Sequence, residues 1–243
     1  MGALPGGGIL IPSAAPSSGE AVVVGRWFDV ERFRHAGRRV VVRAVGEPLL
    51  VLGSAQRAEV VDYARAARAG VEVVRRRGGG GAVLVAPGAQ VWADMWIPAT
   101  DPLWAPEPRR TAVHVGRWWA AALERAGVDA AVHDAPTART PWSDLVCFAG
   151  VGPGEVLTDG RKVVGLAQWR SREGALVFGC AYARFDPALL AECLDLGPAA
   201  RVELEGALGD TVTDLCDLGI SAWNAEDLLA ELPPGGHWDV VRG

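Results

Sequence analysis

Short apolar runs, separated by glycine, proline and charged residues, make up most of the chain. Runs of this length, rich in valine, leucine and aromatic residues, are typical of strands rather than of long helices. The segments that we expect to be strands are 38–45, 48–53, 71–76, 82–86, 91–98, 145–150, 154–158, 161–168 and 174–183.

Helical signals are fewer than strand signals. Segments 57–70 and 109–127 show helical spacing and end on glycine, which commonly closes a helix. Asp186 followed by Pro187 predicts the start of a third helix, and Asn224 can cap a short fourth one.

A tight hairpin is predicted where Asp159-Gly160 stands between two apolar runs, because such a turn needs positive φ angles. A hairpin joins antiparallel strands. We therefore expect an α/β or α+β fold, with one large mixed and mainly antiparallel sheet flanked by helices.

Composition narrows the class of protein. The 243 residues are 50% hydrophobic with a net charge of −5, which gives no support for binding to nucleic acid or to an anionic membrane. We find no transmembrane run and no secretory signal, and the four cysteines lack CxxC pairing, so we expect a cytoplasmic protein.

The histidines lack metal-site spacing, and we predict no metal site formed by protein side chains. Residues 1–19 read as a flexible tail, and 20–243 as a single domain.

A glycine run, Gly78 to Gly81, follows three arginines and separates two of the predicted strands. Glycine allows main-chain N–H groups to approach a ligand closely, and arginine can grip phosphate or carboxylate oxygens. A plain flexible loop in a glycine-rich chain explains the same pattern. The run is neither a Walker A loop nor a dinucleotide fingerprint.

Lysine occurs once, at Lys162, among 24 basic residues. Chance survival in an arginine-biased sequence is one explanation. The other is chemical, because an ammonium is a compact charge that guanidinium cannot imitate. Strand alternation places Lys162 on the same face as Val164 and Leu166, which predicts a partly dry site.

These two stretches together resemble the lipoate–protein ligase A family of the biotin/lipoate A/B protein ligase superfamily. The family has Arg-Arg, two residues and Gly-Gly-Gly-Ala-Val, followed later by Lys-Val-x-Gly-x-Ala. This chain has the first pattern at 75–83 and the second at 162–167. The segments LLVLGSAQ at 49–56 and SDLV at 143–146 also match the family, so the resemblance covers about residues 38–196.

The resemblance implies a catalytic domain with a class II synthetase/biotin-ligase-like sheet. It also implies that ATP and lipoate form lipoyl-AMP, with Mg²⁺ entering only with ATP, and that the acyl group passes to a carrier lysine. Lys162 matches the family's catalytic lysine, which contacts both the acyl carbonyl and the phosphate. The positions matching the nucleotide and acyl site are Arg76, Gly79, Gly80, Gly81, Ala82, Val83, Leu84 and Gly165.

The implied partners are lipoyl carrier domains, namely 2-oxoacid dehydrogenase E2 subunits and the glycine cleavage H protein, and we expect a monomer. Three departures bear on activity. The family's His-Asp-x-Gly-Asn is replaced by 85–89, its His-Gly by Phe178-Gly179, and the asparagine after Gly-x-x-Gln by Arg57. We also expect that the accessory C-terminal domain of the ligases is missing.

Cys147 supports a second hypothesis. It lies in a Cys-Phe pair before the lysine strand, which resembles a cysteine-dependent octanoyltransferase branch of the superfamily. There the cysteine takes octanoyl from acyl carrier protein as a thioester, without ATP. A buried structural cysteine is the alternative explanation. A third hypothesis is a non-catalytic relative that binds an acyl group, an adenylate or a carrier domain.

Overall fold

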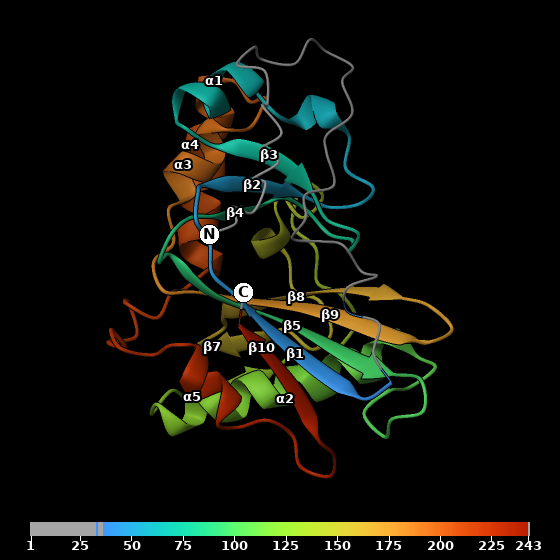
Figure 1. Cartoon of the computed structure of the whole chain (residues 1–243). Helices are drawn as coiled ribbons and strands as arrows, with labels where there is room; N and C mark the ends of the chain where they lie inside the picture. Colours follow the sequence, from blue (N-terminus) through green and yellow to red (C-terminus); the bar gives the residue numbers. More distant parts are fainter. Residues whose placement is uncertain (1–32, 34–35, 243) are drawn as a thin grey trace, which may run out of the picture.

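A seven-stranded sheet forms the centre of the computed structural model, which describes Phe33 and residues 36–242 (Figure 1). Its order is β10-β1-β5-β9-β8-β7-β6, and all neighbouring pairs are antiparallel except β1 with β10. The large, mainly antiparallel sheet is thus confirmed. Its strands are β1 (Arg38–Arg43), β5 (Gln90–Pro98), β6 (Ala131–Val132), β7 (Val156–Thr158), β8 (Arg161–Arg170), β9 (Gly174–Tyr182) and β10 (Trp238–Arg242).

Both faces of this sheet are covered, which explains why β5 and β9 are buried at every position and are mostly apolar. Along β5, Trp92 and Trp96 belong to one core, whereas Met95 and Ile97 belong to the core on the opposite face. Side chains of a strand alternate between faces, so a strand buried on both sides reads as a continuous apolar run.

One face packs against α2 (Pro108–Arg125) and α5 (Ala225–Leu229), which lie beneath the sheet in Figure 1. The other face packs against a second sheet of three strands, in the order β3-β2-β4. These strands are β2 (Leu49–Leu52), β3 (Glu72–Arg75) and β4 (Val83–Val85), and the helices beside them are α1 (Tyr63–Arg68), α3 (Pro187–Glu192) and α4 (Pro198–Thr211). This second, smaller sheet was not expected, and it arises because the first runs after β1 form a separate layer.

Two further segments differ from expectation, and three elements were not expected. The helix predicted at 57–70 is split into η3 (Ala58–Val60) and α1, because Val61 forms a bridge with Leu194 and Asp62 caps a new helix. Segment 145–150 is not a strand but holds a short 3-10 helix, η4 (Cys147–Ala149). The helix α4 and the strands β6 and β10 had no signal that we recognised.

The turn and cap signals are confirmed. Asp159 and Gly160 have φ angles of 48° and 77°, as the hairpin between β7 and β8 requires. The Asp186 side chain accepts a hydrogen bond from Leu189 N, and Asn224 forms a capping box. The predicted tail at 1–19 lies outside the described residues. In the part of the chain that the structure describes, no helix is long and apolar enough to cross a membrane.

The closest approach between α2 and the turn before β7 depends on a missing side chain. A Cβ atom at Gly116 would lie 2.0 Å from the carbonyl oxygen of Gly154. In contrast, a Cβ atom at Gly206 in α4 would meet nothing within 4 Å. These two helical glycines form a matched pair.

We expect Gly116→Ala to lower the free energy of unfolding by about 1–3 kcal/mol, because the added methyl forces the backbone apart. Gly206→Ala should raise it by about 0.5–1 kcal/mol, since alanine is the better helix former. Urea denaturation of both variants checks this. Equal stability of the two variants would show that α2 does not press on the turn at Gly154.

Candidate active site

The glycine run between β3 and β4 is folded around the side chain of Arg76. Arg76 is 1% exposed, and its guanidinium donates to the carbonyl oxygens of Val51, Gly79 and Gly81 at 3.1, 2.7 and 2.8 Å. Gly80 has a φ angle of 90°, which favours glycine. Arg76 therefore acts as an internal clamp that fixes the course of the loop.

Segment 145–147 runs beside the loop and brings Cys147 to it. Ala82 N donates to Leu145 O at 2.8 Å, and Cys147 N donates to Ala82 O at 3.0 Å. A Cβ atom at Gly80 would lie 3.3 Å from Cys147 Sγ, and one at Gly81 would lie 2.5 Å from the backbone of Val146. The glycines are thus required by the close packing of two backbone segments.

Lys162 is buried next to this segment. Its side chain is 1% exposed, and Nζ donates to Cys147 O at 2.8 Å and lies 5.1 Å from the centre of the Phe148 ring. The fold therefore places the ammonium beside the glycine loop rather than in bulk water.

A β-bulge decides which face of β8 carries the lysine. The register changes from Lys162 opposite Leu157 to Val164 opposite Val156, so β8 has one extra residue at this point. Phe148 contacts the Lys162 ammonium, and a Cβ atom at Gly165 would lie 2.8 Å from the same ring. Lys162 thus shares the face of Gly165, and its expected alignment with Val164 and Leu166 is wrong, because a bulge shifts the alternation.

Glu155 is the counter-ion of Lys162, and its side chain is almost as deeply buried. Its Oε2 accepts from Lys162 Nζ at 2.8 Å and from Gly152 N at 2.6 Å, while Oε1 accepts from Leu166 N at 3.1 Å. No motif pointed to Glu155. The sequence did contain one signal, because Glu155 is the single carboxylate in the apolar run 154–158. A charge in such a run is expected to be buried, and a buried charge needs a partner.

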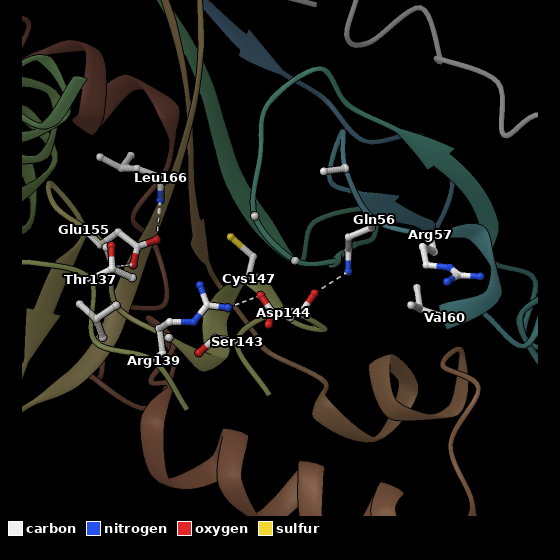
Figure 2. Close-up of a pocket in the computed structure, with 16 residues that line it drawn as sticks. Gln56, Arg57, Val60, Thr137, Arg139, Ser143, Asp144, Cys147, Glu155 and Leu166 are labelled. Atoms are coloured by element: carbon white, nitrogen blue, oxygen red, sulfur yellow. Dashed lines mark hydrogen bonds and ion pairs between the residues drawn. The ribbon is translucent and has the colours of Figure 1, made fainter. Parts of the chain in front are cut away.

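A cavity of about 550 Å³ opens in front of these groups (Figure 2). Figure 2 shows the sulfur of Cys147 between Glu155 and Leu166 on one side and Gln56 on the other. Gly80 and Gly81 also line the cavity, whereas Lys162 lies behind its wall. Two arginines stand at this cavity as well: Arg57, which is exposed, and Arg139, which pairs with Asp144.

The remaining sequence-predicted positions lie behind the loop. Ala82, Val83 and Leu84 are buried in the core between the two sheets. A narrow cavity of about 10 Å³ adjoins Cys147 and Leu166, and Arg76, Val83 and Gly165 are among its lining residues. Gly79 is exposed on the outer side of the loop. The structure thus gathers these residues in one region, where some of them line the two cavities and the others lie in the surrounding core or on the surface.

Burial affects the titration of groups around Arg76. It lowers the pKa of the Arg76 guanidinium, although the neighbouring Cys147, Tyr182 and Cys180 oppose this by favouring the cation. Burial raises the pKa of the Cys180 thiol and the pKa of the Tyr182 hydroxyl. It also raises the pKa of Cys193 to about 11. Cys180 and Cys193 are therefore poor thiolates, in agreement with a structural role.

Residues 30–232 match the family described as the lipoyl protein ligase A/B catalytic domain. The chain belongs to this family. Its family and fold are those of lipoate–protein ligases, and this supports an enzymatic function. No curated protein matches the sequence.

Solved structures with the same fold include several ligases. A lipoate-protein ligase A bound with ATP aligns at a TM-score of 0.60 and 18% identity, covering 84% of this chain and 73% of that chain. Protein Ta0514 from T. acidophilum, with bound lipoic acid, aligns at 0.63 and 15% identity, covering 87% and 80%. A bi-partite lipoate protein ligase from Thermoplasma acidophilum, studied with its E2 lipoyl domain, aligns at 0.62 and 15%, covering 87% and 78%.

The segment that departs from the family motif forms the turn after β4. Residues 86–89 form a tight turn, with Ala89 N donating to Ala86 O at 3.1 Å and Gly88 at a φ angle of 69°. Phe178 packs its ring against the loop, since a Cβ atom at Gly78 would lie 2.9 Å from it. Apolar packing thus occupies the position where the ligases have histidine.

We expect Arg76→Lys to lower the free energy of unfolding by about 1–3 kcal/mol, because an ammonium cannot serve the three carbonyls in the same geometry and buried acceptors are left unpaired. Amide exchange at 78–82 should accelerate, as measured by hydrogen exchange. Arg77→Lys is the control, because Arg77 is exposed and its change should stay within about 0.5 kcal/mol. Unchanged exchange in Arg76→Lys would contradict the clamp.

Proposed function

We propose that this domain attaches a lipoyl or octanoyl group to a lysine of a lipoyl carrier domain. The carriers are 2-oxoacid dehydrogenase E2 subunits or the glycine cleavage H protein. Support comes from membership of the lipoyl protein ligase family and from a solved relative of the same fold, which was studied with its E2 lipoyl domain.

The observation that carries this proposal is the wall of the large cavity. Backbone of Gly80 and Gly81, the Cys147 thiol and the Glu155 carboxylate meet there, with the Lys162 ammonium directly behind. Ligand sites typically measure about 300–1,000 Å³, and a cavity of about 550 Å³ falls within this range. The space suits an acyl chain together with an activating group.

In the first candidate mechanism the carboxylate of lipoate or octanoate attacks the α-phosphate of ATP, giving acyl-AMP and pyrophosphate. The carrier amine then attacks the acyl carbon, and AMP leaves. The ATP and lipoic acid bound to two relatives of the same fold support this pair of substrates. Magnesium would enter with ATP.

Lys162 supplies the electrostatic part of this reaction. An ammonium has three N–H donors, and two of them are used by Cys147 O and Glu155 Oε2. We assign the third to the acyl oxygen or the phosphate, on which negative charge develops. Water is largely excluded at this depth, which strengthens the interaction. Arg57 and Arg139 line the cavity, and we assign them to the outer phosphates.

We expect Lys162→Met to reduce lipoate-dependent pyrophosphate release by about 100- to 1,000-fold, the loss typical when one charge-stabilising donor is removed. Lys162→Arg should be similarly impaired, because the buried space and its two acceptors suit an ammonium. Arg172→Met, at an exposed arginine, is the matched control and should keep the wild-type rate. An active Lys162→Met enzyme would exclude this role for the lysine.

Cys147 favours a second candidate mechanism, which needs no ATP. The thiol attacks the thioester of octanoyl–acyl carrier protein, giving octanoyl-Cys147 and the free carrier thiol, and the lysine of the lipoyl domain then takes the octanoyl group and releases Cys147. The specific observation is that this cysteine lines the cavity beside Gly80, whereas Cys180 and Cys193 are buried in the core.

Incubation with octanoyl–acyl carrier protein should then produce a protein adduct with the mass of one octanoyl group, which hydroxylamine removes. Cys147→Ser should abolish it, and Cys216→Ser, at an exposed cysteine, should not. Intact-protein mass spectrometry checks this. An adduct that survives in Cys147→Ser, or no adduct at all, rules out the thioester mechanism.

A further inference from the structure

Glu155 connects three parts of the candidate site through one carboxylate. It accepts hydrogen bonds from Lys162 in β8, from the backbone of Gly152 in the preceding turn, and from the backbone of Leu166 further along β8. Its side chain also lines the large cavity, although it is only 4% exposed. Both of its oxygens are therefore occupied by donors from the protein itself.

This arrangement is a costly way to stabilise a fold. Moving a carboxylate and an ammonium out of water carries a large desolvation penalty, and an apolar pair of the same size is often as stable. The chain nevertheless keeps its one lysine and this glutamate together in an otherwise apolar region that includes Phe148. A functional reason for the pair is thus more plausible than a stabilising one.

The geometry leaves the ammonium little freedom. Nζ is held at 2.8 Å from Glu155 Oε2 and at 2.8 Å from Cys147 O, which approach it from two different segments. Without Glu155, one fixed contact of the ammonium would be lost. The β-bulge directs the lysine side chain toward η4. The Glu155 carboxylate then holds the ammonium of Lys162 at one position behind the cavity wall.

We propose that Glu155 is the positioning residue of this site: it fixes the Lys162 ammonium behind the cavity wall and compensates its charge until substrate is bound. The expected effect of Glu155 on the rate rests on the proposed acyl transfer. Its effect on the position of the Lys162 ammonium does not. Since Glu155 acts through Lys162, its loss should reduce the rate of the chemical step more than the binding of substrates.

The structural half is tested without any substrate. Because the chain has one lysine, protein grown with isotope-labelled lysine gives a single lysine side-chain signal in NMR spectra. Glu155→Gln should shift this signal and speed the exchange of its N–H protons with water. Glu203→Gln removes the same charge from an exposed position of α4 and should leave the signal unchanged. An unchanged signal in Glu155→Gln would overturn the proposal.

The kinetic half uses Glu155→Asp, which keeps the charge but shortens the side chain by one methylene. We expect kcat for acyl transfer to the carrier to fall by about 10- to 100-fold, as when outer partners of other catalytic groups are removed, with KM values within about threefold. Glu203→Asp is the control. A full rate in Glu155→Asp, or a loss confined to KM, would overturn the positioning role.

The two halves also separate this inference from the proposed function. If the wild-type protein transfers no acyl group from either donor, the proposed function fails, and the NMR comparison alone decides whether Glu155 positions the lysine. If wild-type transfer is observed, both measurements must agree. Thermal melting of Glu155→Gln identifies unfolding, and in that case Glu155→Asp, which keeps the charge and the lysine, replaces it in the NMR comparison.

Discussion

The buried ion pair between Lys162 and Glu155 is the interaction on which the candidate site depends. Each partner would be costly to bury alone, and each is held by further hydrogen bonds to backbone atoms of neighbouring segments. The pair therefore fixes the turn before β7, the start of β8 and the 3-10 helix η4 relative to one another. Residues of the turn, Cys147 of η4 and Leu166 further along β8 line the large cavity, so the charge pair supports one side of it.

The opposite side of the cavity is formed by the glycine loop, which a different set of hydrogen bonds holds in place. Arg76 gathers the carbonyl groups of the glycine loop, and the absence of side chains at Gly80 and Gly81 lets segment 145–147 pack directly against it. The second sheet carries this loop, and the first sheet carries the lysine. The site thus lies where the two layers meet, and the stability of each layer determines how well the groups of the site are aligned.

Sequence reasoning predicted the central sheet, the hairpin at Asp159-Gly160 and the capped helices, because apolar periodicity and turn chemistry are local properties. The second sheet and the split of 57–70 depend on pairing between distant segments, such as Val61 with Leu194, and no local signal reports them. The family motif identified Lys162, Arg76 and the glycine loop. It did not identify Glu155, and simple alternation gave the wrong face for Lys162, because one extra residue in β8 is visible only in the register of two strands.

We propose above that a lysine held behind a glycine-lined cavity promotes acyl transfer to a carrier protein. The most direct test is the intact mass of a lipoyl domain after incubation with this protein, with ATP and lipoate in one reaction and octanoyl–acyl carrier protein in another. We expect a gain of one acyl group on the domain in at least one reaction, and no gain when Lys162 is replaced by methionine. An unmodified lipoyl domain in both reactions, or equal modification by the methionine variant, would contradict it.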